Sequence, residues 1–224
     1  MLISACSSSE EELMIEDTPS DDDPTINILS LGDSYTIGQS VCDTCRFPAQ
    51  LLSELEEVYQ PEKEFELEII AQTGWTTSNL ITAIEAESIA SDYDLVTLLI
   101  GVNNQFQNKP FELYQNEFPK LLQTAIRAAQ NDKNRVIVVS IPDYGFTPFG
   151  QNYDQEKISE EIDAYNAFAK GYSESQNVSF VTITDITRQG LDNPDLVAPD
   201  DLHPSELAYS LFVERILPLA MEKI

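Results

Sequence analysis

The chain has 224 residues, 42% of them hydrophobic, which is enough for one buried core, so we expect a single folded domain. Its 39 acidic and 12 basic residues give a formal net charge of −27. This balance argues against nucleic acid and anionic lipid headgroups as ligands, because both are held mainly by Lys and Arg. No apolar run in the sequence is long enough to span a bilayer.

The chain begins with a segment that differs in composition from the rest. Residues 2–6, which end in Cys6, resemble a bacterial lipobox, whose cysteine becomes lipidated after cleavage. Residues 7–24 are rich in Ser, Glu, Asp and Pro, so we expect them to form a disordered tether. A lipid anchor on Cys6 would be the protein's only attachment to a membrane, and it would place an exported protein in the periplasm or at the cell surface. The alternative is an ordinary tail with a chance cysteine.

Strand and helix patterns alternate over the predicted domain, residues 25–224. Apolar runs predict five strands, at residues 26–31, 65–70, 95–100, 136–141 and 178–183. Helical spacing predicts helices at residues 47–59, 76–88, 110–130 and 156–175, and a last helix that starts with Pro204 in its first turn. This alternation predicts a doubly wound α/β fold with a parallel sheet.

Polar residues and glycines gather where the first three predicted strands end and where the last helix begins. These stretches are residues 32–34, 71–75, 101–104 and 200–204. In an open α/β sheet, the loops at the carboxyl ends of the strands form the ligand-binding crevice. We therefore expect the active site to be built from these loops.

The residue types in these loops indicate nucleophilic catalysis. Ser34 is the candidate nucleophile, and a serine hydroxyl needs a nearby base, usually an imidazole. His203 is the chain's only histidine, so a Ser–His mechanism has no other source for that base. Asp200, three residues earlier, can orient the imidazole and stabilise its charged form.

This set of residues, in this order, resembles the SGNH (GDSL) hydrolases, a family of esterases and lipases. The resemblance covers residues 26–224 and implies a flavodoxin-like three-layer α/β/α sandwich with a five-stranded parallel sheet. It also implies acyl-ester hydrolysis through a serine, with no metal and no organic cofactor. The four namesake positions of the family correspond to Ser34, Gly74, Asn103 and His203. The implied oxyanion donors are the N–H groups of Ser34 and Gly74 and the side-chain amide of Asn103, and the family's DxxH spacing selects Asp200.

Two positions depart from the family's pattern. Asn104 stands where an aspartate is common, and Tyr35 stands where a leucine is common. We expect Tyr35 to narrow or polarise the mouth of the pocket. Neither change removes a catalytic group.

The substrate is expected to be a small-molecule, lipid or glycan ester. The residues that we expect to contact it are Asp33, Trp75, Asn104, Tyr144 and Phe146, and Phe106 and Phe149 lie in the same loops. We also expect Asp33 to brace the turn that carries the nucleophile. For each aromatic residue, the alternative is simple packing of an irregular loop onto the core.

Two specific activities and one different class of protein remain open. The chain could be a carbohydrate esterase that removes acetyl groups from a polysaccharide, or a lysophospholipase or short-chain lipase. The third reading is a binding module that has the fold without catalysis.

Cys42 and Cys45 form a single CxxC pair after the nucleophile loop. One such pair, without a second pair or nearby histidines, is weak evidence for zinc. In an exported protein the pair would form a disulfide, and that disulfide would stiffen the loop that follows Ser34.

Overall fold

The computed structural model describes residues 25–224, so Cys6 and the predicted tether lie outside the described residues. The described chain forms one five-stranded parallel sheet with the strand order β2-β1-β3-β4-β5. The strands are β1 (Ile26–Gly32), β2 (Phe65–Ala71), β3 (Leu95–Leu99), β4 (Val136–Val139) and β5 (Ser179–Val181). This is the strand order of a flavodoxin-like fold, and the predicted fold class is confirmed.

The strand order places β1 between β2 and β3, with Leu31 aligned to Ile70 on one side and to Leu98 on the other. The chain winds outward in opposite directions from β1 and β3. In such sheets, ligands bind in the crevice outside the carboxyl ends of the strands at this switch point. The end of β1 is therefore the place where the fold favours a binding site.

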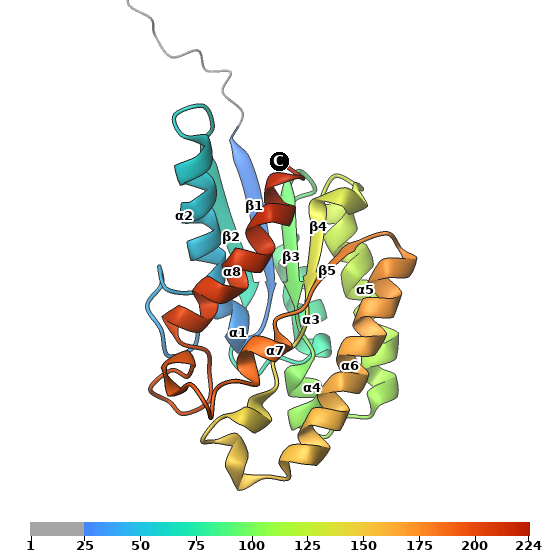
Figure 1. The fold of residues 1–224 in the computed structure, drawn as a ribbon. Helices are drawn as coiled ribbons and strands as arrows, with labels where there is room; N and C mark the ends of the chain where they lie inside the picture. Colours follow the sequence, from blue (N-terminus) through green and yellow to red (C-terminus); the bar gives the residue numbers. More distant parts are fainter. Residues whose placement is uncertain (1–24) are drawn as a thin grey trace, which may run out of the picture.

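Helices cover both faces of the sheet (Figure 1). On one face α2 (Phe47–Tyr59) packs against α8 (Glu206–Met221), whereas α3 (Thr77–Glu87), α5 (Phe111–Ala128) and α6 (Gln155–Ser175) cover the other. All five residues of β3 are buried as a result, which explains why this strand is continuously apolar. The C-terminus lies at the end of the sheet opposite to α1, α4 and α7 (Figure 1).

Three short helices follow the carboxyl ends of strands. They are α1 (Ser34–Ile37) after β1, α4 (Val102–Phe106) after β3 and α7 (Thr184–Thr187) after β5. After β4 the chain forms two 3₁₀ turns, Tyr144–Phe146 and Gly150–Asn152. The sequence predicted no helix in these segments, because three to five residues are too few to show a helical period.

The prediction for the last helix was wrong in its first turn. Helix α8 begins at Glu206, and Ser205 caps it by accepting a hydrogen bond from the N–H of Ala208 at 3.2 Å. Pro204 lies outside the helix, in an antiparallel bridge with Val197. Ser is a better cap than Pro, because its hydroxyl can bind an unpaired N–H group of the first turn.

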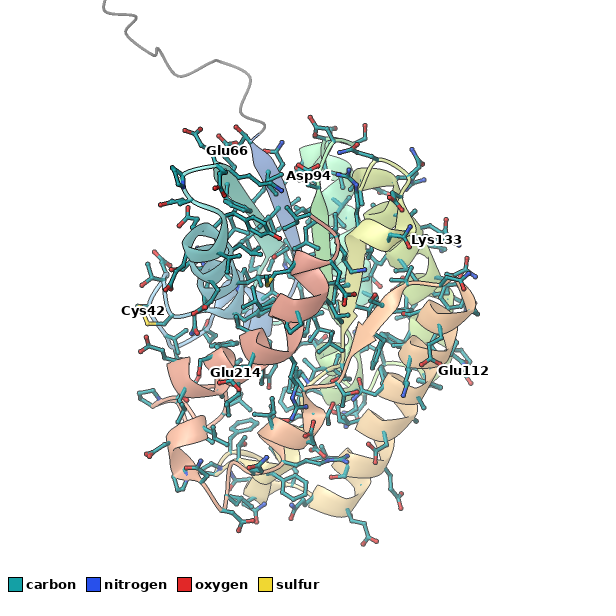
Figure 2. The ribbon with its side chains drawn as sticks, turned by 45° about the horizontal axis from the view of Figure 1, so that its top comes forward. Cys42, Glu66, Asp94, Glu112, Lys133 and Glu214 are labelled. Carbon is teal, nitrogen blue, oxygen red and sulfur yellow. A yellow bond between two sulfur atoms is a disulfide. The ribbon has the colours of Figure 1, made fainter. Side chains whose placement is uncertain are left out.

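The acidic residues are spread over the molecule, and Figure 2 shows Glu66, Glu112 and Glu214 on separate parts of its outer surface. Among the basic residues, Arg188 forms ion pairs with Asp143 and Asp163, and Arg215 forms one with Asp185. Within residues 25–224, no helix combines the length and the apolar character needed to cross a membrane.

Candidate active site

Ser34 lies at the point where β1 turns into α1. Asp33 caps this helix, and its Oδ1 accepts a hydrogen bond from the N–H of Tyr35 at 3.0 Å. A Cβ atom at Gly32 would lie 2.0 Å from Thr36 Oγ1 and 2.6 Å from the Leu99 carbonyl oxygen. Only glycine allows the turn to pass this close to β3, so the Gly-Asp-Ser sequence fixes where the Ser34 hydroxyl emerges.

His203 is held by a carboxylate three residues before it. Its Nδ1 lies 2.6 Å from Asp200 Oδ2, and its backbone N–H donates to Asp200 Oδ1 at 2.9 Å. A carboxylate can only accept, so Nδ1 carries the proton and Nε2 is left with a free lone pair. This is the tautomer that a general base requires.

Asp200 also accepts a hydrogen bond from Ser40 Oγ at 2.7 Å, on the same oxygen that faces the imidazole. Partial burial tends to raise the pKa of Asp200, but the hydrogen bonds from Ser40 and from His203 outweigh it and lower the pKa to about 2. The carboxylate therefore stays charged at any working pH. No sequence signal pointed to Ser40, because it is 160 residues away from Asp200 in the chain.

Tyr35 lies deeper than the sequence suggested. It is buried, and its ring centroid lies 5.1 Å from that of His203 at an interplanar angle of 51°. Tyr35 also lines the pocket around Ser34, and the expectation that it narrows or polarises the pocket mouth stays a prediction. Its ring packs against the imidazole and limits how far His203 can move.

Three donors face the same pocket as the Ser34 hydroxyl: the N–H groups of Ser34 and Gly74 and the side-chain amide of Asn103 on α4. Within the described part of the chain, neither N–H group donates to another backbone group. Asn103 Nδ2 meets no acceptor there at normal hydrogen-bond geometry, but it lies close enough to Asp33 to lower the pKa of that carboxyl. Gly74 has φ = 84°, and a Cβ atom there would meet nothing within 4 Å, so the backbone angle and not the space requires glycine.

The pocket around Ser34 has a volume of about 220 Å³. The residues that line it are Ser34, Tyr35, Thr73, Gly74, Val102, Asn103, Phe106, Tyr144, Phe149, Leu202 and His203. Ser34 Oγ forms no hydrogen bond with any residue from 25 to 224, yet it shares the pocket with the imidazole. Such contacts are often long in ligand-free sites and shorten in the substrate complex.

Phe106, Tyr144 and Phe149 form an aromatic wall of this pocket. The Phe106 ring lies 5.6 Å from Tyr144 in an edge-on arrangement and 6.0 Å from Phe149. The sequence pointed to these three only as aromatic residues in crevice loops. It gave no signal for Thr73, Val102 and Leu202, which are ordinary residues brought to the pocket by the fold.

Three of the expected substrate contacts do not line this pocket. Asn104 is fully buried and ties α4 to α3, since its amide donates to Thr77 Oγ1 at 2.7 Å and accepts from the Thr77 N–H at 2.9 Å. Trp75 packs partly buried against the core. Phe146 lies on a 3₁₀ turn outside the lining set. Gly74 and Asn103, the residues before Trp75 and Asn104, do line the pocket, because a shift of one residue along a turn or helix changes the direction of the side chain.

Asp33 is also unavailable to a substrate, because it is fully buried beneath the nucleophile turn. Burial raises its pKa to about 7, although the Tyr35 N–H and the nearby Asn103 amide oppose this shift. Its Oδ2 has no hydrogen-bond partner among the described residues. The role of Asp33 as a brace for the turn agrees with this position, and a direct substrate contact does not.

A backbone hydrogen bond connects the aromatic wall to residues 200–203, the histidine loop. The backbone N–H of Phe149 donates to the carbonyl oxygen of Asp201 at 2.9 Å, and Asp201 has φ = 65°. Asp143, which is fully buried, holds the start of the aromatic loop by accepting from Ser159 Oγ and Arg188 Nε at 2.7 and 2.9 Å.

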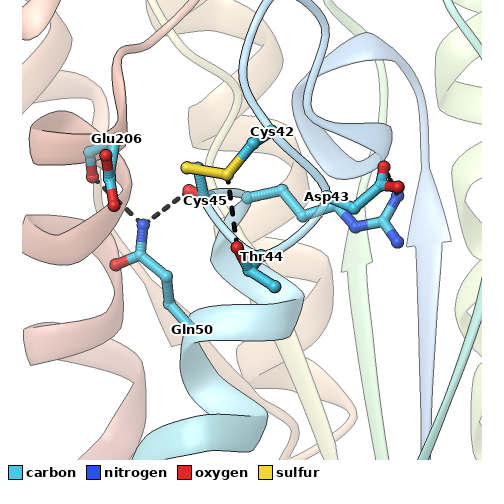
Figure 3. The surroundings of a disulfide bond; sticks show 7 residues. Cys42, Asp43, Thr44, Cys45, Gln50 and Glu206 are labelled. Carbon is cyan, nitrogen blue, oxygen red and sulfur yellow. Dashed lines mark hydrogen bonds and ion pairs between the residues drawn. A yellow bond between two sulfur atoms is a disulfide. The ribbon is translucent and has the colours of Figure 1, made fainter.

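Cys42 and Cys45 are joined by a disulfide in the loop between α1 and α2 (Figure 3). The side chain of Gln50 binds the carbonyl oxygens of both Cys45 and Glu206, so it connects the disulfide loop to the start of α8. Ser40 lies two residues before Cys42. The disulfide therefore constrains the loop directly after Ser40, whose hydroxyl contacts Asp200.

Other parts of residues 25–224 offer less chemistry. No group of three or more His, Cys, Asp or Glu side chains in this range is arranged to hold a metal ion. A larger cavity, of about 780 Å³, lies between α3 and α5 and is lined by neither Ser34 nor His203. We therefore place the active site in the smaller pocket.

Comparison with known proteins identifies the family to which the chain belongs. The GDSL-like lipase/acylhydrolase family matches residues 30–211. No curated protein matches the chain closely enough to count as a relative. A structure of an acetylxylan esterase from Geobacillus stearothermophilus is 20% identical, with a TM-score of 0.64 over 87% of this chain and 94% of that one.

Two further structures share the fold at similar distances. A psychrotrophic esterase from Pseudoalteromonas sp., inhibited by monoethylphosphonate, is 18% identical, with a TM-score of 0.62 over 88% of this chain and 97% of its own. A lipolytic protein of the G-D-S-L family from Veillonella parvula is 17% identical, with a TM-score of 0.64 over 86% and 97%. The match to residues 30–211 covers most of the sequence, and the chain therefore belongs to the GDSL-like lipase/acylhydrolase family of ester hydrolases.

Proposed function

We propose that the protein is a serine esterase that cleaves carboxylic esters with Ser34 as nucleophile, His203 as base and Asp200 as the residue that orients His203. The observation that carries this proposal is the shared pocket: Ser34, an imidazole held at 2.6 Å by a carboxylate, and the residues that carry the three candidate oxyanion donors all line it. A nucleophile, a base, an orienting acid and oxyanion donors are the parts that acyl transfer needs.

The reaction begins when Ser34 Oγ attacks the ester carbonyl carbon and His203 Nε2 takes the hydroxyl proton. The carbonyl π electrons move onto oxygen, and the resulting tetrahedral intermediate collapses with loss of the alcohol, which receives the proton from His203. Water then attacks the acyl-serine, again giving its proton to His203, and Ser34 is restored as the acid leaves. Asp200 remains charged throughout and stabilises the imidazolium in both halves.

The negative oxygen of each intermediate would accept hydrogen bonds from the N–H groups of Ser34 and Gly74 and from Asn103 Nδ2. The two N–H groups donate to no other backbone group of the described residues in the ligand-free site, so they need no rearrangement to receive this charge. Preorganised donors of this kind are often the largest single contribution to catalysis.

The pocket size favours a short acyl group. Its volume of about 220 Å³ is below the range of roughly 300–1,000 Å³ in which drug-sized ligands bind, and aromatic rings close one side. An acetyl group fits this space better than a fatty acyl chain. The acetylxylan esterase among the structures of the same fold supports a carbohydrate esterase, and a lysophospholipase is the competing activity.

The test is labelling of the protein with a fluorophosphonate probe, followed by peptide mapping. We expect the label on Ser34, and we expect Ser34→Ala to lose both the label and the hydrolysis of p-nitrophenyl acetate. A hydroxyl-to-hydrogen change should leave the thermal midpoint within a few degrees of the original.

A protein that takes no label and hydrolyses no short ester, while remaining folded, would be a binding module with this fold. Turnover retained in Ser34→Ala would contradict the assignment of the nucleophile. Comparison of acetate release from acetylated xylan with fatty-acid release from a lysolipid separates the two esterase activities.

A further inference from the structure

The catalytic pocket adjoins a second cavity on the far side of the aromatic wall. This cavity has a volume of about 190 Å³, and it shares Phe106 and Tyr144 with the pocket around Ser34. A third cavity, of about 380 Å³, shares Gln105, Asn108 and Glu161 with the second. The three cavities thus follow one another from Ser34 past Phe106 and along the side of α6, and together they exceed the space that a short acyl group needs.

The second cavity carries exposed aromatic rings. Phe106 is 40% exposed and Tyr153 is 50% exposed, and their rings lie 6.0 Å apart at an angle of 77°. Large aromatic side chains seldom stay this accessible in pairs without a ligand or partner. Tyr153 lines the second cavity and is not part of the catalytic pocket.

Between the rings lies an ordered polar network. Tyr144 Oη donates to Gln105 Oε1 at 2.9 Å, and Gln105 Nε2 donates to Glu161 Oε2 at 2.7 Å. These bonds fix the orientation of the amide and of the carboxylate. The side chain of Asn108 adds a further donor and acceptor to the rim.

The charges of the second cavity disfavour an ionic ligand. The ammonium group of Lys157 lies 3.7 Å from Glu161 Oε1, so its charge is compensated, and Asp154 adds a second carboxylate to the lining. A phosphate or carboxylate placed in the second cavity would meet two carboxylates and one ammonium group, which disfavours its binding there. A long acyl chain would displace water from the half-exposed Glu161 carboxylate without replacing its hydrogen bonds.

Flat aromatic faces next to fixed amide and carboxylate groups suit a neutral molecule that has both C–H faces and many hydroxyls. We propose that this second cavity and its extension toward Lys109 form a subsite that binds the alcohol part of the ester as an uncharged oligosaccharide. Tyr153 and Phe106 stack on the sugar rings, and Gln105, Asn108 and Glu161 bind their hydroxyls. This inference rests on the proposed function, in which the acyl group occupies the pocket around Ser34.

The test measures binding without turnover. In the Ser34→Ala protein, isothermal titration with partly O-acetylated xylohexaose gives the reference Kd. Addition of Tyr153→Ala should raise that Kd by at least about tenfold, because an exposed stacking ring is removed. Lys170→Ala, an exposed position on the same helix α6 outside the groove, is the matched control and should leave the Kd unchanged.

The proposed subsite would be wrong if the Ser34→Ala protein bound no oligosaccharide, or if adding Tyr153→Ala left its Kd unchanged. Tighter, Tyr153-dependent binding of lauroyl lysophosphatidylcholine would also contradict it. Thermal midpoints of all variants verify that they are folded. The labelling and hydrolysis assays on the unmodified protein decide the proposed function separately, since oligosaccharide binding that depends on Tyr153 supports the subsite even if Ser34 proves unreactive.

Discussion

Ser40 Oγ donates a hydrogen bond of 2.7 Å to Asp200 Oδ2, the oxygen that also holds His203. Ser40 has φ = 70°, and it lies two residues before the Cys42–Cys45 disulfide. The nucleophile loop and the histidine loop are thus connected through the carboxylate that both of them contact.

Ser40→Ala should lower kcat for p-nitrophenyl acetate by about threefold to tenfold, because a hydrogen bond to a charged group is lost and Asp200 holds the imidazole less firmly. The bond is solvent-exposed, which places the effect at the lower end for charged hydrogen bonds. Steady-state kinetics at several pH values measures the change. Ser53→Ala, at an exposed position on α2, is the control. Equal kcat in the two variants would show that Ser40 does not position Asp200.

Asn103 and Asn104 are adjacent, but their substitutions should have opposite consequences. Asn103→Ala removes a proposed oxyanion donor and should lower kcat by about 10²–10³-fold with little change in KM. The loss of stability should be smaller than in Asn104→Ala, because Asn103 Nδ2 meets no acceptor among residues 25–224 at normal hydrogen-bond geometry and only lies near the Asp33 carboxyl. Kinetics and urea unfolding of the same preparation measure both quantities.

Asn104→Ala, in contrast, removes two buried hydrogen bonds to Thr77 and should reduce the free energy of unfolding by about 1–3 kcal/mol. Activity per folded molecule should fall far less than in Asn103→Ala. A reversal of the two patterns would contradict the roles assigned to these neighbours.

Asp33→Asn should change the pH dependence of stability. The carboxyl pKa rises from 3.8 to about 7 through burial, so the folded state holds the proton more tightly than the unfolded state does. The resulting stabilisation is complete below pH 3.8 and is lost as the pH rises through 7. Asparagine keeps the cap on α1 without this titration, because it is an equally good N-cap residue.

The difference in unfolding free energy between Asp33→Asn and the original protein should therefore grow in favour of the variant between pH 4 and pH 8. The rise in the pKa of Asp33 from 3.8 to about 7 corresponds to a change in unfolding free energy on the order of 4 kcal/mol. Urea unfolding across this pH range measures it. Parallel stability curves would show that Asp33 does not titrate in this way.

Loss of the disulfide should cost stability without abolishing the fold. Replacement of Cys42 and Cys45 by serine opens a very short loop, for which the chain-entropy relation gives a loss of about 2 kcal/mol. Chemical denaturation with and without dithiothreitol measures the effect. The reductant should destabilise the original protein but leave the double-serine variant unchanged, and an equal response of both would implicate another target.

The fold was predictable because each strand and long helix has a clear period, and the alternation of the two leaves few topologies. Ser34, Gly74, Asn103 and His203 were singled out by their resemblance to the SGNH pattern and by their places at strand ends or before the last helix, and all four line one pocket. Other features depend on the direction of a side chain or on contacts between distant segments. Asn104 turns into the interior one residue after Asn103, and Ser40 reaches a carboxylate from another part of the chain. Local sequence patterns do not encode such relationships.

The hydrogen bond from the Phe149 N–H to the Asp201 carbonyl has a consequence for engineering and for divergence within the family. Insertions or deletions near Phe149 that reshape the aromatic wall would displace the backbone between Asp200 and His203. Replacement of the loop around Phe149 by that of another family member should therefore lower kcat unless residues 200–203 are exchanged with it. The two segments are distant in sequence, but a change in the backbone of one is expected to require a matching change in the other.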